Sequence, residues 1–176
     1  MSAEFCVTLA IKMTEDLKTF MSQNKTGIPV EKLHITLAKF KVNKEDVVCP
    51  ILIKLNQLSN LIKSFTIKTQ NVLHVKKTNV VKLELNEIST SKINEVRKIV
   101  VKHFEKLSFL KPTDMLCKPH VTLIRECYNE PVITKIRNSI SLSTLEILMW
   151  NSEKNKEILP LNGTKVFLTG QSKNCF

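Results

Sequence analysis

Residues 33–40 read Leu-His-Ile-Thr-Leu-Ala-Lys-Phe, and residues 118–125 read Lys-Pro-His-Val-Thr-Leu-Ile-Arg. Both stretches are rich in aliphatic residues with polar residues between them, a pattern typical of a β-strand. Each contains a His-x-Thr tripeptide, which we call the first motif (His34-Ile-Thr36) and the second motif (His120-Val-Thr122). Because side chains alternate faces along a strand, the histidine and threonine of each motif share one face. One such tripeptide arises easily by chance, whereas two in similar strands indicate a common role.

The elements around the two motifs predict an α+β fold. Apolar spacing and turn residues predict these strands: Phe5–Lys12, Leu33–Lys41, Phe65–Val75, Asn79–Asn86, Pro119–Arg125, Ser143–Trp150 and Thr164–Thr169. Helices are expected from a Thr14 cap to Gln23, over Lys44–Ser64 with Pro50 in the first turn, from a Ser89 or Thr90 cap to Leu107, and over Pro131–Ile140. The order of strands and helices in the first half of the chain is similar to that in the second half. We therefore expect one domain over residues 1–176, with two similar lobes that each contribute one motif strand to a cleft.

The composition excludes several classes of protein. With only three glycines, the chain has no Gly-rich loop of the P-loop or dinucleotide-binding kind. Five cysteines form no C-x-x-C pair and no zinc spacing, which favours a reducing compartment. No signal peptide or apolar stretch of about 20 residues is recognised, so we expect a soluble, cytoplasmic protein. The net charge of +11 favours an anionic partner, although a lysine-rich soluble surface explains it equally well.

The two motifs together suit phosphodiester chemistry. A neutral histidine can accept a proton from the attacking hydroxyl or water, and a protonated histidine can give one to the leaving oxygen. Both forms are available near neutral pH, since the pKa of imidazole is about 6.5. The threonine hydroxyls can donate hydrogen bonds to the non-bridging phosphate oxygens, where negative charge builds up in the transition state. This chemistry requires no metal and no cofactor.

The two stretches also resemble the paired signatures of the 2H phosphoesterase superfamily, the LigT-like cyclic phosphodiesterases. The resemblance implies a bilobal α+β fold with two pseudo-symmetric lobes of antiparallel strands, outer helices and an active-site cleft between the lobes. Carried over residue by residue, it implies that His34 and His120 are catalytic and that Thr36 and Thr122 bind the phosphate. We expect His34 to be the base and His120 the acid, although the sequence does not decide the order.

Further substrate contacts are less constrained. Strict alternation puts Phe40 on the His34 face, where its ring could stack on a base, but a core aromatic fits equally well. Arg125 lies on the face opposite His120 unless the strand ends or bulges there, yet an arginine at this place resembles the family. Tyr128 and Trp150, the only Tyr and Trp, are candidates for base stacking.

The resemblance implies cleavage or hydrolysis at a ribose 2′ position of a nucleotide or oligonucleotide. A free-standing domain of this kind looks similar to viral members that destroy 2′-5′ oligoadenylate or the 2′-5′-linked cyclic GMP–AMP, in the host cytoplasm. We expect a monomer that has no membrane partner. Two alternatives stay open, a 2′,3′-cyclic phosphodiesterase acting on RNA ends and a non-catalytic nucleotide- or RNA-binding module.

Overall fold

The computed structural model describes most of the chain. The described residues are 3–12, 14–24, 27–29, 32–42, 48–105, 107, 110–112, 117–133, 136, 139–151, 156–159 and 165–170, with the backbone alone for 110–112, 150–151 and 156–159. The strands are β1 (Ala3–Ala10), β2 (His34–Val42), β3 (Phe65–Val75), β4 (Val80–Leu85), β5 (Leu110–Pro112), β6 (His120–Ile124), β7 (Ser139–Leu142), β8 (Thr144–Asn151), β9 (Lys156–Leu159) and β10 (Lys165–Phe167). The helices are α1 (Glu15–Gln23), α2 (Val48–Ser59) and α3 (Glu87–Phe104).

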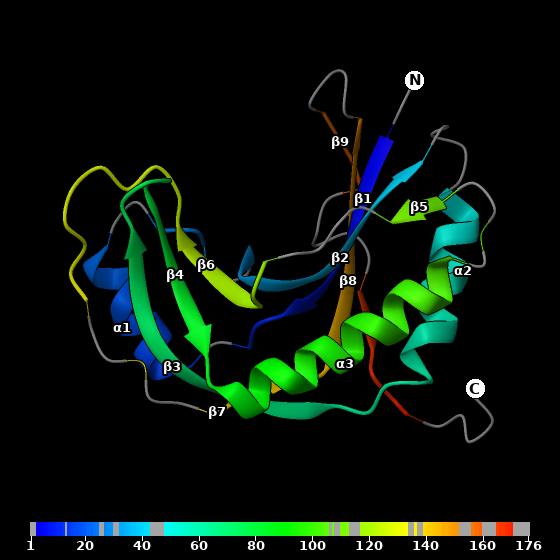
Figure 1. The fold of residues 1–176 in the computed structure, drawn as a ribbon, viewed down its shortest axis with the longest axis horizontal. Coiled ribbons are helices and arrows are strands. Elements are labelled where there is room, and N and C mark those ends of the chain that lie inside the picture. Colours follow the sequence, from blue (N-terminus) through cyan, green and yellow to red (C-terminus); the bar gives the residue numbers. More distant parts are fainter. Residues whose placement is uncertain are drawn as a thin grey trace.

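All strand pairs in the described chain are antiparallel, and they join into one curled sheet. The order along the sheet is β10-β8-β1-β2-β6-β4-β3-β7, with β5 beside β2 and β9 beside β8. Figure 1 shows the two expected lobes. One contains β1, β2, β8 and β10, and the other contains β3, β4, β6 and β7, so each lobe takes strands from both halves of the sequence. The motif strands β2 and β6 are neighbours at the centre of this order.

The helix caps confirm one prediction and correct another. Thr14 caps α1, accepting a hydrogen bond from the Leu17 amide, as the sequence predicts. The cap of α3 is Asn86 rather than Ser89 or Thr90, because the Asn86 side chain accepts from the Ser89 amide. An asparagine at the end of a strand suits the extended cap conformation as well as serine does.

The predicted helix over Pro131–Ile140 is wrong for the residues that the structure describes. Residues 131–133 and 136 are not helical, and Ser139 and Ile140 begin β7, which pairs with β3. The Asn24 side chain bonds both the backbone amide and the carbonyl of Val132. These tertiary bonds hold the backbone at Val132 in place of helical hydrogen bonds, and they tie it to the end of α1.

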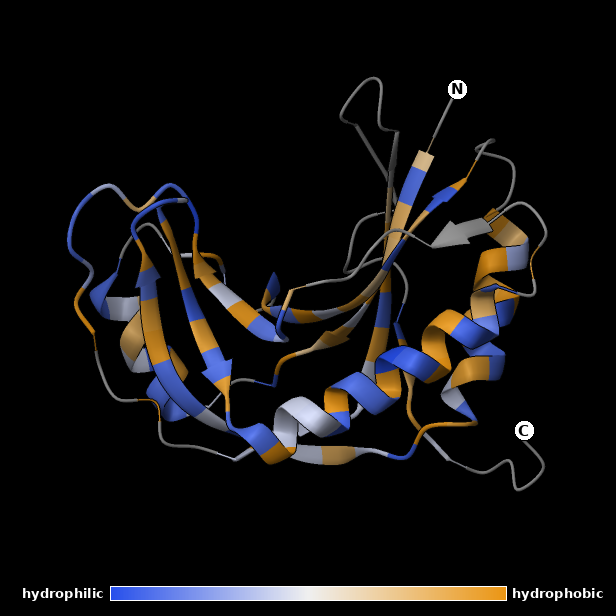
Figure 2. Cartoon of the chain, in the orientation of Figure 1, coloured by the Kyte–Doolittle hydropathy of each residue, from blue (hydrophilic) through white to orange (hydrophobic). Residues whose placement is uncertain are grey.

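The helices cover the face of the sheet opposite the motif side chains. Phe104 of α3 packs against Phe5 of β1 and Phe40 of β2, with ring centroids 5.0–5.5 Å apart, and all three are fully buried. In Figure 1, α2 and α3 lie on the side of β1, β2 and β8, while α1 lies beside β3, β4 and β6. The strands carry hydrophobic and hydrophilic residues in succession, as amphipathic layers require (Figure 2). No helix in the described part of the chain is long and apolar enough to cross a membrane.

Candidate active site

The two motif strands meet at a single residue pair. Ile35 of β2 lies opposite Val121 of β6, and both side chains are fully buried. The residues on either side of each, His34 and Thr36 in β2 and their counterparts His120 and Thr122 in β6, are only half-buried and point to the opposite face. In an antiparallel pair this register brings His120 level with Thr36 and His34 level with Thr122. The four polar side chains therefore form one group with approximate two-fold symmetry about the Ile35–Val121 pair.

Each motif histidine is held by the carbonyl two residues before it. His34 Nδ1 lies 2.9 Å from the Lys32 carbonyl oxygen, and His120 Nδ1 lies 2.9 Å from the Lys118 carbonyl oxygen. A carbonyl can only accept, so Nδ1 carries the proton in both rings. In the neutral state this leaves a lone pair on Nε2 of each histidine. Both rings are consequently oriented for proton transfer at Nε2.

The surroundings lower the pKa of both histidines. Burial lowers the pKa of His34 most, and the cations Arg125 and Lys39 and the ring of His120 lower it further, against the opposing bond to Lys32. Burial also dominates for His120, and its charged neighbours are mixed. Lys82 and Arg97 lower its pKa, whereas Glu84, directly opposite His120 on β4, raises it. Of the groups named here, Glu84 is the one carboxylate, and it acts on His120, where it favours the protonated form of the ring.

A β-bulge follows each motif at the same position. Against its outer neighbour β1, strand β2 has one extra residue at Leu37, since Thr8 pairs with Thr36 and Val7 with Ala38. Against β4, strand β6 has one extra residue at Leu123, since Lys82 pairs with Thr122 and Val81 with Ile124. A bulge of one residue reverses the alternation of faces beyond it. The residues that follow each motif therefore lie on the faces opposite to those that strict alternation predicts.

The prediction that Phe40 lies on the His34 face is therefore wrong. Beyond the Leu37 bulge, Ala38, Phe40 and Val42 face the core, and Phe40 stacks on Phe5. Phe40 is fully buried and cannot contact a base in this structure. Beyond the same bulge, Lys39 is exposed and lies on the motif face.

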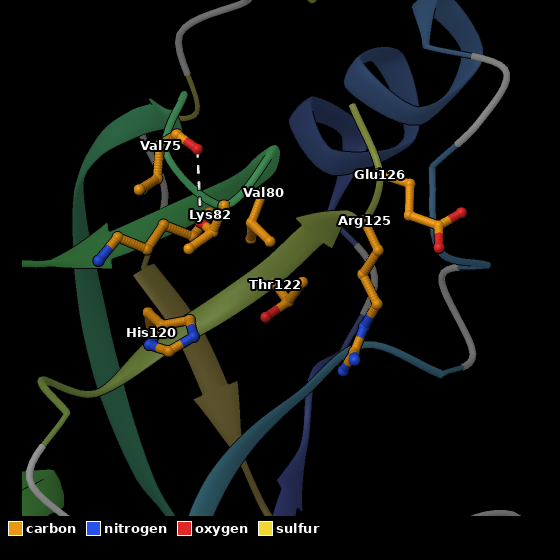
Figure 3. Close-up of a pocket in the computed structure, with 8 residues that line it drawn as sticks. Val75, Val80, Lys82, His120, Thr122, Arg125 and Glu126 are labelled. Carbon is orange, nitrogen blue, oxygen red and sulfur yellow. Dashed lines mark hydrogen bonds between the residues drawn. The ribbon is translucent and has the colours of Figure 1, made fainter. Parts of the chain in front are cut away.

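Arg125 follows the last residue of β6, and its side chain lies beside the second motif. Together with His120, Thr122, Lys82 and Glu126 it lines a pocket of about 520 Å³, shown in Figure 3. The pocket also has apolar walls from the turn between β3 and β4. Its size is within the range of small-molecule sites.

The remaining stacking candidates are placed elsewhere or not described. Tyr128 is 74% exposed and does not line the pocket shared by His120 and Arg125. Trp150 belongs to β8, but its side chain lies outside the described residues. The structure therefore does not bring the Tyr128 ring to the second motif.

Arg97 of α3 links strand β2 to the segment that leads into β6, and the sequence contains no direct signal for this role. Its guanidinium donates to the Thr36 carbonyl oxygen (3.0 Å) and to the Cys117 carbonyl oxygen (2.9 Å). The side chain is nearly buried. It satisfies one backbone acceptor in the first motif and one in the segment just before the second motif, so it ties these two parts of the chain together.

Two charged residues of β4 lie beside the second motif, and the sequence pattern does not predict that they belong to the site. Lys82 and Glu84 lie opposite Thr122 and His120, and the Lys82 Nζ is 3.9 Å from the Glu84 carboxylate. Alternation along β4 could have placed both on one face, but the pairing of β4 with β6 is not visible in the sequence. Among the described residues, no three His, Cys, Asp or Glu side chains are grouped to hold a metal ion.

Solved structures share this architecture. TT0787 of Thermus thermophilus superposes with a TM-score of 0.65 at 14% identity, over 97% of this chain and 100% of that chain. LigT of E. coli, complexed with 3′-AMP, gives 0.64 at 15% identity over 96% and 99%. The same protein complexed with ATP gives 0.61 at 15% identity over 96% and 99%. At these identities the likeness concerns the fold, which is the bilobal LigT-like α+β fold.

The fold and the paired motif strands define a member of the 2H phosphoesterase superfamily. More specifically, a family model described as "AKAP7 2'5' RNA ligase-like domain" matches residues 9–171, so the chain belongs to this family. Compared with curated protein sequences, the chain has no significant match. Membership supports a phosphodiesterase or RNA ligase-like activity.

Proposed function

We propose that the chain is a metal-independent phosphodiesterase that cleaves 2′-5′ bonds between nucleotides with its two His-x-Thr motifs. The observation that carries the proposal is the Ile35–Val121 pair, which gathers the two half-buried motifs on one face. The 2′-5′ linkage is supported by the description of the matching family model. Nucleotide binding is supported by the complex of LigT with 3′-AMP, a nucleotide whose phosphate is on the 3′-oxygen of the ribose.

In the proposed reaction the 3′-hydroxyl beside the 2′-linked phosphate attacks phosphorus. The O3′–P bond forms, the P–O5′ bond breaks, one histidine takes the proton of the 3′-hydroxyl, and the other gives a proton to O5′. The products are a 2′,3′-cyclic phosphate and a free 5′-hydroxyl. The same pair could then hydrolyse the ring with exchanged roles, or activate water from the start. The hydroxyls of Thr36 and Thr122 donate to the non-bridging oxygens throughout.

The charges around the histidines support His34 as base and His120 as acid. Among the described residues, the charged groups that act on His34 are the cations Arg125 and Lys39 and the ring of His120, and they favour its neutral form. Of the two histidines, His120 is the one with a carboxylate neighbour within the described part of the chain, Glu84, which favours the protonated form that a general acid needs. The anionic substrate would add to this effect by raising the pKa of His120 when it binds.

The biological role that follows from this proposal is the removal of 2′-5′-linked second messengers. Two substrates fit the linkage, 2′-5′ oligoadenylate and the 2′-5′-linked cyclic GMP–AMP. Their destruction in the host cytoplasm by a viral enzyme would suppress an innate immune response. The proposal in this form requires a nucleotide-sized site at the cleft, and the pocket beside His120 is large enough for a nucleoside.

The test uses purified protein with EDTA and a panel of oligonucleotides analysed by chromatography. The panel contains a 2′-5′ adenylate, the matching 3′-5′ adenylate, cyclic GMP–AMP with a 2′-5′ bond, and an RNA that ends in a 2′,3′-cyclic phosphate. We expect cleavage of the 2′-5′ bonds in EDTA, well above the rate for 3′-5′ bonds. Equal rates on the two linkages, or activity only with added magnesium, would refute the proposal. Turnover of the cyclic RNA end alone would favour the RNA-processing alternative.

A further inference from the structure

The approximate two-fold symmetry of the motifs does not extend to the strands on their outer sides. Beside the second motif, β4 places charged residues, Lys82 opposite Thr122 and Glu84 opposite His120. Beside the first motif, β1 places uncharged residues at the equivalent positions, and these are Thr8 and Ala10. Pairing with a motif strand therefore does not require charge at these positions, so it does not explain the Lys82–Glu84 pair.

The ammonium group of Lys82 has three hydrogen-bond donors and, among the described residues, no acceptor within hydrogen-bond distance. Its ion-pair partner there is Glu84, with Nζ 3.9 Å from the carboxylate oxygen. Charge-assisted hydrogen bonds of this kind are about 2.7–2.9 Å long, so the contact is electrostatic only. The side chains of Lys82 and Glu84 are 23% and 22% exposed. A cation that has lost much of its water without gaining a hydrogen bond favours an anionic ligand.

Lys82 is placed where such a ligand is expected. It lines the same pocket as His120, Thr122 and Arg125, and in Figure 3 Lys82 and His120 lie beside each other on neighbouring strands. Residues directly opposite each other in an antiparallel pair have Cβ atoms about 4.5–5.5 Å apart, a distance that the flexible four-carbon stem of lysine spans. The ammonium can therefore reach an anion that is bound to the Thr122 hydroxyl.

Lys82 also acts on the protonation of His120. In the described part of the chain, the titratable and charged side chains that interact with His120 are Lys82 and Glu84 of β4, Arg97 of α3 and His34 of β2. Burial lowers the pKa of His120 most, Lys82 lowers it most among the charged side chains, and Glu84 raises it. An anion that neutralises Lys82 leaves the effect of Glu84 in place and so favours the protonated ring.

We propose that Lys82 binds the scissile phosphate together with Thr122 and gives up its ion pair with Glu84 for this contact, an inference that rests on the proposed function. In the free enzyme, the Lys82 cation opposes protonation of His120. In the complex the phosphate neutralises this cation, and Glu84 stabilises the protonated ring that gives its proton to O5′. Binding of the phosphate thus prepares the general acid for the reaction.

Three variants test the proposal. Lys82→Met removes the charge and keeps most of the stem, whereas Lys82→Arg keeps the charge. Lys76→Met is the matched control, because Lys76 lies in the turn of the same hairpin and forms an exposed ion pair with Glu130, 3.3 Å apart. Thermal unfolding checks that each variant is folded. If Lys82→Met does not fold, the double variant Lys82→Met/Glu84→Gln, which has no carboxylate left without its cation, is compared with Glu84→Gln.

Two measurements report on the contact, calorimetric binding of 3′-AMP and cleavage of a 2′-5′ adenylate dimer. We expect Lys82→Met to lower both the affinity for 3′-AMP and the kcat/KM by roughly tenfold to 100-fold, the size of a hydrogen bond to a charged group. Lys82→Arg should retain most of both, and Lys76→Met should behave like the wild type. Unchanged affinity and kcat/KM in Lys82→Met would overturn the proposal.

The pH profile of kcat/KM separates this role from a structural one. Loss of the Lys82 cation raises the pKa of His120 in the free enzyme, so the alkaline limb should move to higher pH in Lys82→Met. A limb that stays in place or moves to lower pH contradicts the coupling to His120. If 3′-AMP binds through Lys82 but no 2′-5′ bond is cleaved, the proposed function fails and the phosphate contact is still supported.

Discussion

At the scale of residues, each imidazole of the site is tied through Nδ1 to a carbonyl, and the charges around it decide which one holds a proton. Arg125 and Lys39 act on His34, whereas both an anion, Glu84, and a cation, Lys82, act on His120. The two rings are equivalent in geometry and unequal in electrostatics. An acid and a base can arise in this way from one repeated tripeptide.

This inequality predicts the pH dependence of kcat/KM, which reports the pKa values of the free enzyme. A base works above its pKa and an acid below its own, so the maximum lies between the two values. Since the pKa of each histidine is lowered from 6.5, we expect the maximum below pH 6.5. Glu84→Gln removes the group that raises the pKa of His120, and should move the alkaline limb to lower pH.

The control for this profile is Glu130→Gln, because Glu130 pairs with Lys76 at the exposed surface, 3.3 Å apart. It should leave both limbs in place. A maximum above pH 7.5, or a profile that Glu84→Gln leaves unchanged, would contradict the assignment of the acid.

A second residue-scale prediction concerns Phe40. Because its ring is fully buried against Phe5 and Phe104, Phe40→Ala should lower the free energy of unfolding by roughly 3–5 kcal/mol. Below the melting temperature of the variant, KM for the nucleotide should change less than twofold or threefold. Denaturant unfolding and steady-state kinetics measure the two effects. A large rise in KM with unchanged stability would restore a stacking role for this ring.

At the scale of elements, the bulges show where reading the sequence reaches its limit. Strict alternation places the histidine and threonine of each motif on one face, and the structure has them there. It fails a few residues later, because a bulge depends on the register with an outer strand that is distant in sequence. For this reason alternation puts Phe40 on the wrong face and does not single out Lys39.

The helices give the same lesson. The apolar stripe of α3 is visible in the sequence, whereas Arg97, which links β2 to the segment before β6, is recognised only from its contacts. The short helix expected near Pro131 fails because hydrogen bonds from Asn24 fix that backbone in another conformation. In both cases, side chains far away in the sequence decide the outcome.

The element-scale prediction is that Arg97 is a positioning residue. Arg97→Met leaves the carbonyls of Thr36 and Cys117 without this donor, so the free energy of unfolding should fall by roughly 2–3 kcal/mol. For a chain of this length the melting temperature should drop by roughly 5–10 °C. We also expect kcat to fall more than KM rises, because the spacing of the motifs changes rather than the binding surface.

Arg97→Lys can bond one of the two carbonyls and should recover part of both effects. If Arg97→Met melts like the wild type and keeps its kcat, the link between α3 and the motifs has no role in catalysis.

At the scale of the whole molecule, the net charge of +11 acts on every anionic ligand. Lysines distributed over the surface create a field that raises the concentration of nucleotides near the protein, and salt screens this field over about 8–10 Å at 0.1–0.15 M. This field attracts anionic ligands in general and does not determine which reaction is catalysed. The reaction depends on the histidines and threonines of the two motifs, at the junction of the two lobes.

Salt should therefore affect binding more than chemistry. Between about 20 mM and about 300 mM KCl we expect KM for a 2′-5′ adenylate trimer to rise several-fold, while kcat changes less than twofold. A dimer with one phosphate serves as the control and should show a weaker dependence. Equal salt dependence of the two substrates would mean that the overall charge does not assist oligonucleotide binding.

The central claim is that His34 and His120 act as one acid–base pair on one phosphate, and a double-mutant cycle on kcat tests it most directly. His34→Ala and His120→Ala should each lower kcat by roughly 10²–10⁴-fold, with nucleotide affinity largely retained. The kcat of the double variant should be at most about tenfold lower than that of the less active single variant, because the effects of removing groups that work as a unit do not add. His74→Gln, at a ring bonded to the Cys127 carbonyl, is the control. Losses that multiply in the double variant, or a single variant that keeps more than about a tenth of the wild-type kcat, would contradict the claim.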